Sequence, residues 1–511
     1  MRERVLTWDV PGAVDAEVAF AALWGDAEHA FWLDTAAGSG GVSYLGAAAW
    51  AVDAEEIRLR GGDVLGWLRA ERARWDVDCS GLDSGGASGG FALGIVGWLG
   101  YELYAETMGL GAMSPRRYPD ALLMRVDRAI AVDHGSGRAR LLARGTAWDG
   151  ELAAWREHVL AALAAVSERE SAPAPRVLPA GPGDPGGRFR RPTDLPTLQR
   201  RNEHGTSEHT GKADAAGPAR PTAATAGIAD SAVEWAYSDA DYLEMVRACQ
   251  HAIAEGDAYV LCLTTEARVD GAFDPWEVYR RVRRSSPSHH GAFLRSGPVA
   301  LLSASPEQFL AVDRDGWVET KPIKGTRPRG ATPAEDAALA AELRADEKER
   351  AENVMIVDLM RNDLSRVCEV GTVEVVRLLD VETYPHVHQL VSTVGGRLAP
   401  GRDAVHAVAA CFPAGSMTGA PKHSAVSILS RLEARSRGIY SGAFGYFGYD
   451  GAVDLAMTIR SIVIDADGAT VGTGGGITAL SVPGDELAEA RLKAAALLAA
   501  LGEPPSGAGG A

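Results

Sequence analysis

The feature that most constrains the fold of this 511-residue chain is a long interior stretch that cannot form a hydrophobic core. From Ser167 to Ser231 the sequence is rich in proline, glycine, alanine, threonine and charge, with few aliphatic side chains. Such a segment does not bury enough apolar surface to offset the entropy cost of ordering it. We therefore predict four parts: an N-terminal region at 1–166, a disordered linker at 167–231, a C-terminal region at 232–502 and a flexible tail at 503–511.

The charge balance argues against polyanionic partners. The chain has 51 Lys and Arg against 68 Asp and Glu, a formal net charge of -17, and no Lys/Arg-rich run stands out. Nucleic acid and anionic membrane surfaces are therefore not expected to bind. The five cysteines include no Cys-x-x-Cys pair, so neither a disulfide framework nor a zinc site is indicated. Without an apolar signal segment or a bilayer-length apolar run, we expect a cytoplasmic protein.

Predicted strands and helices occur in runs rather than in strict alternation. Short apolar stretches punctuated by glycine predict strands at 30–35, 42–46, 95–101, 259–264 and 300–304. Helices are expected at 151–166, at 347–360, at 485–501 and from a Ser238 cap to about Ala254. This arrangement favours an α+β fold over a Rossmann-type one. The glycine run at 472–476 is not a Gly-x-Gly-x-x-Gly fingerprint.

The second half of the chain carries a series of unusual polar segments, each weak when taken alone. They are Ser305-Pro-Glu-Gln308, Lys321-Pro-Ile-Lys-Gly-Thr-Arg327, Lys348-Glu-Arg-Ala-Glu-Asn353, His386-Val-His-Gln389, Gly415-Ser-Met-Thr418, Ile439-Tyr440, Thr458-Ile-Arg460 and Gly472-Thr-Gly-Gly-Gly476. In this order and spacing they resemble the chorismate-utilising enzymes: the anthranilate, aminodeoxychorismate, isochorismate and salicylate synthases. The match covers roughly residues 237–501. The resemblance implies an α+β, layered α/β/β/α antiparallel β-sandwich of the anthranilate synthase component I type.

Lys324 separates the members of this family. As a lone residue it would be interpreted as a surface lysine in a basic loop beside Lys321 and Arg327. Similar anthranilate synthases carry alanine here, whereas aminodeoxychorismate synthases carry a lysine that attacks ring carbon 2 while the hydroxyl at carbon 4 departs. Ammonia then attacks carbon 4 and expels the lysine. An attacking lysine must be neutral, and we expect burial or a neighbouring cation such as Lys321 to lower its pKa.

Two further residues have catalytic roles implied by the resemblance. Glu307 is the candidate general acid for the departing hydroxyl, because a carboxyl in a partly apolar site can keep its proton near neutral pH. The alternative is a solvated glutamate in a turn. His388 matches the active-site histidine by resemblance, although a lone histidine in an apolar stretch is more often a hydrogen-bonded core residue.

The family places a magnesium ion on two carboxylates that here are Glu352 and Glu489. Mg²⁺ prefers oxygen ligands and usually takes one or two protein carboxylates plus water and substrate oxygens. The ring carboxylate of chorismate would complete the site. The alternative interpretations are helix-surface charge for Glu352 and an i,i+4 ion pair with Lys493 for Glu489.

The other substrate carboxylate, on the enolpyruvyl arm, needs directed donors. Arg460 can bind it bidentately, Tyr440 can donate a hydroxyl, and the glycine run lets backbone N–H groups approach. The substrate-binding residues implied by the resemblance are Gly325, Thr326, Ser416, Tyr440, Arg460, Gly474, Gly476 and Lys493.

The resemblance thus implies conversion of chorismate and ammonia to 4-amino-4-deoxychorismate, on the route to p-aminobenzoate and folate. Anthranilate synthase component I is an alternative, against which Lys324 and Phe31-Trp-Leu-Asp-Thr35 argue, since those enzymes carry Leu-Leu-Glu-Ser at the latter place. Isochorismate and salicylate synthases use a lysine on the strand that here begins Tyr259-Val260-Leu261, which has none. A catalytically inactive chorismate-binding subunit is the last alternative.

Glutamine-derived ammonia would require a second protein. The matching amidotransferases carry their nucleophilic cysteine in Gly-x-Cys-x-Gly-x-Gln, and none of the five cysteines has that context. We therefore expect a glutamine amidotransferase subunit as the partner that supplies ammonia.

Overall fold

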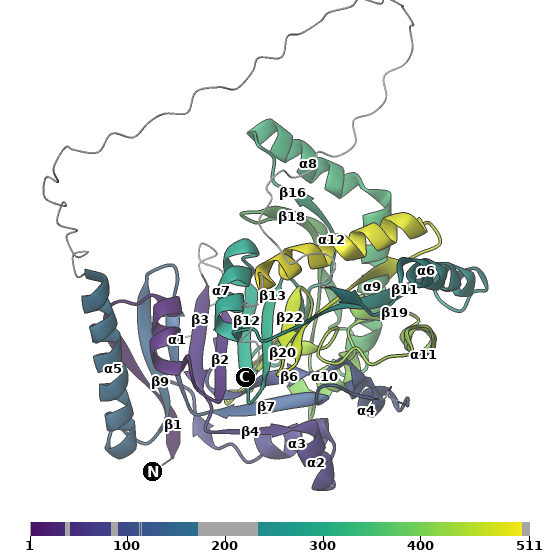
Figure 1. Cartoon of the computed structure of the whole chain (residues 1–511). Coiled ribbons are helices and arrows are strands. Elements are labelled where there is room, and N and C mark those ends of the chain that lie inside the picture. The colour runs from purple at the N-terminus through teal and green to yellow at the C-terminus, as the bar shows by residue number, and fades with distance from the viewer. Residues whose placement is uncertain are drawn as a thin grey trace, which may run out of the picture.

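The computed structural model describes residues 2–35, 41–82, 90–111, 113, 115–171 and 233–502. Two large antiparallel sheets pack face to face, and helices cover their outer faces (Figure 1). Helix α5 (Gly150–Ser171) continues past the predicted start of the linker. The rest of the predicted linker and the tail at 503–511 lie outside the described residues.

The larger sheet has 13 strands and contains segments from both ends of the chain. Its order is β10 (Glu234–Trp235), β11 (Val260–Asp270), β23 (Gly468–Ile477), β22 (Ser461–Ile464), β13 (Val299–Ser305), β12 (His290–Ser296), β2 (His29–Asp34), β3 (Val42–Ala47), β8 (Arg128–Asp133), β9 (Arg138–Gly145), β1 (Glu3–Ala13) and β5 (Val77–Asp78), with β19 (Gly419–Ala420) also paired to β11.

The smaller sheet has 10 strands. Its order is β16 (Ile323–Pro328), β18 (Val387–Arg397), β15 (Trp317–Thr320), β14 (Gln308–Val312), β21 (Val453–Met457), β20 (Ala443–Gly448), β6 (Gly94–Leu99), β7 (Ala121–Val126) and β4 (Trp50–Asp53), with β17 (Glu374–Thr383) on β18. In the two sheets the parallel pair is β1 with β5, and the other strand pairs are antiparallel.

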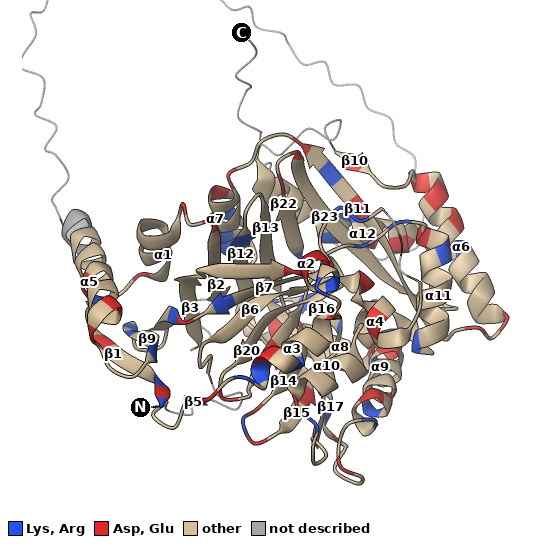
Figure 2. Ribbon diagram, turned by 90° about the horizontal axis from the view of Figure 1, so that it is seen from below, with Lys and Arg blue, Asp and Glu red and all other residues tan. Residues whose placement is uncertain are grey.

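The helices form the two outer layers. The larger sheet is covered by α1 (Ala16–Trp24), α5, α6 (Asp239–Ala254), α7 (Pro275–Ser285), α11 (Lys422–Glu433) and α12 (Pro483–Leu501). The smaller sheet is covered by α2 (Ala54–Leu59), α3 (Val64–Arg72), α8 (Pro333–Ala345), α9 (Glu347–Ser365) and α10 (Ala404–Cys411). A short helix, α4 (Tyr104–Met108), lies beside them (Figure 1). Figure 2 shows acidic and basic residues interspersed over these elements.

The two sheets bury a shared apolar layer. Phe31 and Leu301 from the larger sheet meet Trp98 and Phe444 from the smaller sheet, and all four side chains are at most 2% exposed. Because alternate side chains of a strand point to opposite faces, each sheet buries a second set of residues against its own helices. Both predicted regions of the chain contribute to this layer.

Strand pairing joins the two regions of the chain in both sheets. β2 pairs with β12, and β6 pairs with β20, so residues on either side of the predicted linker are hydrogen-bonded neighbours. The expected helix after Ser238 is present as α6, and the Ser238 side chain caps it by accepting from the backbone N–H of Asp241. Within the described ranges, no helix is long and apolar enough to cross a membrane.

Candidate active site

Lys324 lies at an irregularity near the edge of the smaller sheet. The register of β16 with β18 shifts between Ile323 and Thr326, so the stretch in between leaves the regular ladder. Gly325 has φ +83°, and a Cβ there would lie 2.7 Å from Leu343 Cδ1. Only glycine tolerates both the left-handed backbone and that close approach. The bulge turns Lys324 inward, where its side chain is 15% exposed.

Carboxylates surround the Lys324 ammonium. Its Nζ lies 3.9 Å from Glu352 Oε2 on α9. Burial acts to lower the pKa of Lys324, but the negative charges of Glu352, Glu307 and Glu349 outweigh it and raise the pKa above its ordinary value. The expectation of a lowered pKa was therefore wrong, because the sequence did not reveal the acidic neighbours.

Glu307 lies beside Lys324 in the short connection between β13 and β14. The residue is 6% exposed, and burial raises the pKa of its carboxyl to about 7, although Lys324, the Ser416 side chain and the Ile323 backbone act in the opposite direction. A carboxyl that keeps its proton near neutral pH can serve as a general acid. Ser416 sits on the turn Gly415–Met417 and is itself 8% exposed.

Helices α9 and α12 bring acidic side chains toward one another. Lys348 Nζ lies 4.0 Å from Glu352 and 3.3 Å from Glu486, so it bridges the two helices. Burial raises the pKa of Glu352, two lysines lower it, and the negative charges of Glu486 and Glu489 raise it further. The negative charge of Glu489, the other glutamate predicted as a metal ligand, thus acts on Glu352.

This acidic group fits the requirements of a divalent cation. Carboxylates from two helices converge, and their countercharges are lysines at 2.8 to 4.0 Å, including Lys493 beside Glu489. Among the described residues, no group of three or more His, Cys, Asp or Glu side chains lies in an arrangement that could hold a metal ion. One or two carboxylates, with water and substrate oxygens, is the ligand set that Mg²⁺ usually takes.

The glycine run of β23 lets an aromatic side chain lie directly on the strand. A Cβ at Gly472 would be 2.1 Å from the Tyr440 ring, so the ring occupies the space of a side chain. Arg460 has φ +50°, and its guanidinium forms no ion pair with any residue that the structure describes. Its charge is coupled to Tyr440 and to Glu489, which places these three groups near one another. An unpaired arginine beside a tyrosine suits a carboxylate ligand.

The rest of the glycine run faces the acidic group. Lys493 Nζ donates to the Gly474 carbonyl at 2.9 Å. A Cβ on Gly474 would lie 2.2 Å from the Leu263 carbonyl oxygen, so a side chain is excluded there. A Cβ on Gly476 would lie 3.4 Å from Glu352 Oε2 and 3.7 Å from Lys324 Nζ. Gly474, Gly476 and Lys493 therefore lie with Lys324 and Glu352 around one centre.

Two predicted residues make contacts away from this centre. His388 is 2% exposed, and its ring nitrogens lie 2.9 Å from Thr383 Oγ1 and 2.9 Å from Asp336 Oδ1 on α8. These are the contacts of a hydrogen-bonded core histidine, and its catalytic role stays a prediction. Thr326 resumes the ladder opposite Gln389 and has an exposed side chain.

Sequence reasoning missed three members of the group. Glu349 and Glu486 each precede a predicted metal ligand by three residues, a spacing that puts both carboxylates on one helix face. The repeated Glu-x-x-Glu pattern on two helices was the signal that could have identified them. Cys262 on β11 pairs with Gly476, and burial raises the pKa of its thiol despite the nearby charges of Arg437 and Lys324.

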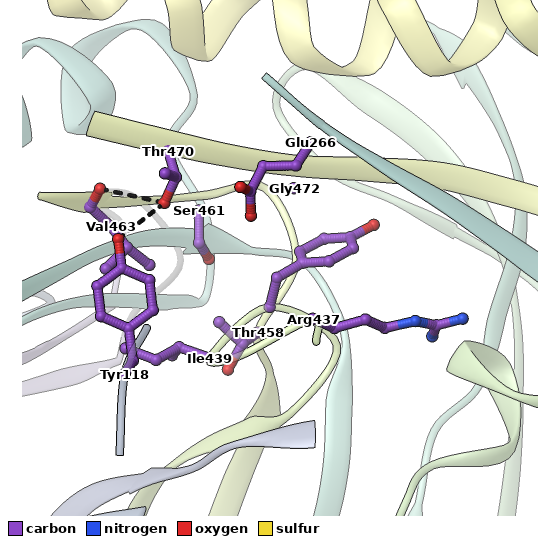
Figure 3. A pocket seen from close by; sticks show the side chains of 10 residues that line it. Tyr118, Glu266, Arg437, Ile439, Thr458, Ser461, Val463, Thr470 and Gly472 are labelled. Atoms are coloured by element: carbon purple, nitrogen blue, oxygen red, sulfur yellow. Dashed lines mark hydrogen bonds between the residues drawn. The ribbon is translucent and has the colours of Figure 1, made fainter. Parts of the chain in front are cut away.

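Enclosed cavities lie outside this centre. One has room for about one water molecule and lies behind Tyr440, where Glu266, Thr458 and Ser461 line it (Figure 3). Another is lined by Asp34, Arg283 and their neighbours under α7. Neither is lined by Lys324, so the candidate site is identified by its converging charged groups.

Comparison with known proteins agrees with this geometry. The family model described as chorismate binding enzyme matches residues 28–499. The chain is 41% identical to the aminodeoxychorismate synthase of Streptomyces pristinaespiralis over 97% of its own length and 64% of that protein. It thus spans less than two thirds of that relative. It is also 36% identical to anthranilate synthase component 1 of Streptomyces coelicolor, covering 96% of this chain and 87% of that one.

Solved structures support the fold. The crystal structure of anthranilate synthase component I from Streptococcus pneumoniae superposes with a TM-score of 0.62 at 23% identity, covering 98% of this chain and 92% of that one. The expected layered α+β sandwich of this type is confirmed. With a family match over nearly the whole described chain, the protein belongs to the chorismate binding enzymes.

Proposed function

We propose that the chain is the chorismate-converting part of an aminodeoxychorismate synthase, which replaces the carbon-4 hydroxyl of chorismate with an amino group from ammonia. The observation that carries this proposal is that the side chain of Lys324, 15% exposed, lies next to Glu307. The Glu307 carboxyl has a pKa of about 7 and can therefore donate a proton. The 41% identity to an aminodeoxychorismate synthase supports the same assignment.

In the proposed reaction, Lys324 Nζ forms a bond to ring carbon 2 as the ring double bonds shift and the carbon-4 hydroxyl leaves as water with the Glu307 proton. Ammonia then bonds to carbon 4, the double bonds shift back, and the lysine amine is released. Lys324 must first release a proton to solvent, a loss that the negative charges around it oppose. The bond to carbon 4 first gives an ammonium group. This group transfers its extra proton to the Glu307 carboxylate, which restores the acid.

The two substrate carboxylates would be bound by different groups of the site. Arg460 and Tyr440, with the backbone at Gly474, are proposed for the enolpyruvyl carboxylate, because this arginine forms no ion pair with any described residue. Glu352 and Glu489 are proposed to hold Mg²⁺, which would supply positive charge for the ring carboxylate of the substrate.

A second candidate function is anthranilate formation. It is favoured by the 36% identity to anthranilate synthase component 1, most of whose length this chain covers. Lys324 argues against it, because a lysine that attacks the ring has no role in that reaction. The two activities differ in their product, since anthranilate formation also releases pyruvate.

Incubation with chorismate, Mg²⁺ and ammonium tests the proposal directly. Separation by mass and retention is expected to give 4-amino-4-deoxychorismate and no pyruvate. Anthranilate with stoichiometric pyruvate would instead support the second candidate, and unchanged chorismate would support an inactive chorismate-binding subunit.

An amidotransferase partner is a further part of the proposal. The relative from Streptomyces pristinaespiralis is longer than the region matched here, and none of the five cysteines has the sequence context of a glutaminase nucleophile. We expect the chain alone to use ammonium salts but not glutamine, and to gain glutamine dependence when a cognate glutaminase is added. Glutamine-driven turnover by the chain alone would contradict this.

A further inference from the structure

The backbone that carries Lys324 is not held by the regular ladder of the sheet. β16 pairs with β18 at Ile323 and again from Thr326, and the register shifts between them. A residue in such an irregularity lacks the paired hydrogen bonds that normally fix a strand. Accurate placement of the Lys324 amine therefore requires another anchor on the flanking backbone.

Asn353 supplies that anchor from α9. Its side chain is fully buried, and Nδ2 lies 3.4 Å from the Pro322 carbonyl oxygen and 3.4 Å from the Leu390 carbonyl oxygen. Pro322 is two residues before Lys324, and Leu390 is on the partner strand β18. One amide therefore ties the helix to both strands at the place where their ladder is interrupted.

Ser392 fixes the orientation of this amide. Its hydroxyl donates to Asn353 Oδ1 at 2.5 Å and accepts from the Leu379 backbone N–H at 2.9 Å. The Ser392 backbone N–H also donates to the Pro322 carbonyl at 3.2 Å. Because the amide oxygen accepts from the hydroxyl, the NH₂ group faces the two carbonyls. The amide is therefore a bridge with a defined direction and not a space-filling side chain.

The same helical turn also presents the carboxylate that pairs with the lysine. Glu352 immediately precedes Asn353 on α9, and its Oε2 lies 3.9 Å from Lys324 Nζ. We propose that Asn353 is a positioning residue that holds the Lys324 strand in register with Glu352. The inference rests on the role proposed for Lys324, and it adds a residue that does not itself touch the reacting atoms.

Asn353→Asp is the sharpest variant, because it keeps the size of the side chain. It replaces a donor by an acceptor opposite two carbonyl oxygens, so attraction becomes repulsion. Ser392→Ala is a second variant in case the first fails to fold, since it removes the donor to Oδ1 and leaves the two Nδ2 contacts. Asn362→Asp is the matched control, because Asn362 lies on the same helix with an exposed side chain.

Three quantities are measured on each variant with Mg²⁺ present: kcat with ammonium, the Kd of chorismate by calorimetry, and the rate at which a small amine-reactive reagent labels Lys324, quantified by peptide mass spectrometry. For Asn353→Asp we expect kcat to fall about 10- to 100-fold, as small displacements of a reacting group do. The Kd of chorismate should change little, and the labelling rate of Lys324 should differ from that of the control.

The outcomes separate the two proposals. The positioning role would be overturned if Asn353→Asp and Ser392→Ala had the same kcat and the same Lys324 labelling rate as the control Asn362→Asp. An unchanged kcat with a raised Kd of chorismate would also overturn it, because that would mean damage to substrate binding and not displacement of Lys324. If the wild-type chain makes no 4-amino-4-deoxychorismate, the proposed function fails, while the labelling comparison still decides whether Asn353 positions Lys324.

Discussion

Two ion pairs in the C-terminal half of the chain differ in burial and in hydrogen bonding: the side chains are 1% and 3% exposed in Arg437–Glu433, and 15% and 9% exposed in Lys324–Glu352. Arg437 and Glu433 are joined by two bonds of 2.8 Å, and Arg437 also donates to the carbonyls of Met417 and Cys262. Lys324 lies 3.9 Å from Glu352 and donates no hydrogen bond to any residue in the described ranges. The first pair is complete within the protein, whereas the second leaves donors and acceptors unused.

The difference indicates where a ligand is expected. Burying a charge is costly unless hydrogen bonds replace the lost water, and the Arg437 pair meets this requirement with protein atoms alone. Glu433 also accepts from the backbone N–H and the hydroxyl of Thr264. Lys324 has no such hydrogen bonds among the described residues, and we propose that substrate and cation complete this group. We therefore assign stability to the first group and chemistry to the second.

The largest expected effect is on catalysis at Lys324. Lys324→Ala removes the proposed nucleophile, and we expect aminodeoxychorismate formation to fall by about 10³-fold or more while chorismate still binds. Turnover with ammonium and a chorismate Kd check this, and denaturation with urea should show little change. Mass spectrometry of the wild type with chorismate but no ammonia should find an adduct on this lysine. Unchanged turnover would eliminate the covalent mechanism.

Disruption of the Arg437–Glu433 pair should lower the stability of the fold. Glu433→Ala leaves Arg437 buried without its carboxylate, and the free energy of unfolding should drop by about 3–5 kcal/mol. Glu244→Ala is the control, because its pair with Arg247 is exposed and should contribute about 0–1 kcal/mol. Urea unfolding measures both. Equal losses for the two variants would mean that the buried pair is not the stabilising element.

Glu307 should show a trade between stability and activity. Burial raises its pKa to about 7 in the folded chain, against 4.5 in the unfolded one, so its contribution to the free energy of unfolding falls as pH rises from about 4.5 to 7. Glu307→Gln avoids this cost. The variant should be more stable than the wild type by about 1–3 kcal/mol at pH 8, and this advantage should vanish near pH 4.5.

The same substitution removes the proposed proton donor. Turnover of Glu307→Gln should fall about 100-fold at pH 8. Urea unfolding at pH 4.5 and pH 8 tests the predicted change in stability, and turnover at pH 8 tests the predicted loss of activity. A variant that is no more stable at pH 8 but loses activity would show that Glu307 is not held in an unfavourable charged state.

The smallest expected effects concern the acidic group. Glu352→Gln and Glu489→Gln each remove one anionic oxygen donor, so the Mg²⁺ concentration for half-maximal activity should rise about 10-fold. Glu347→Gln, on the same helix as Glu352 and without a proposed metal contact, is the control. Titration of Mg²⁺ into chelator-treated protein gives the values. Full activity of the wild type in excess EDTA would exclude the magnesium role.

Local sequence signals predicted the elements that carry the site. The Ser238 cap and the helices expected at 347–360 and 485–501 correspond to helices α6, α9 and α12. The polar segments around Glu307, Lys324 and the glycine run fall on strands or strand ends. These features depend on neighbouring residues and can be inferred without tertiary contacts.

Other properties depended on residues that are distant in sequence. The pKa of Lys324 is raised because α9 places Glu352 and Glu349 beside it, and the anchor of its strand is the buried amide of Asn353. His388 lies in a segment that resembles the family's motif, but residues of α8 and β17 contact both of its ring nitrogens. Motif matching identifies residue types and does not indicate which of two opposite strand faces a side chain occupies.

The amino-acid sequence by itself determined the family, the α+β class and the candidate residues, because these follow from motif order, periodicity and composition. Tertiary structure decided which charges meet, which side chains are buried and which strands pair across 167–231. The physical reason is that local backbone preferences act over a few residues. Burial, electrostatic coupling and sheet register instead depend on contacts between segments that may be hundreds of residues apart, such as Glu102 with the backbone of Arg437.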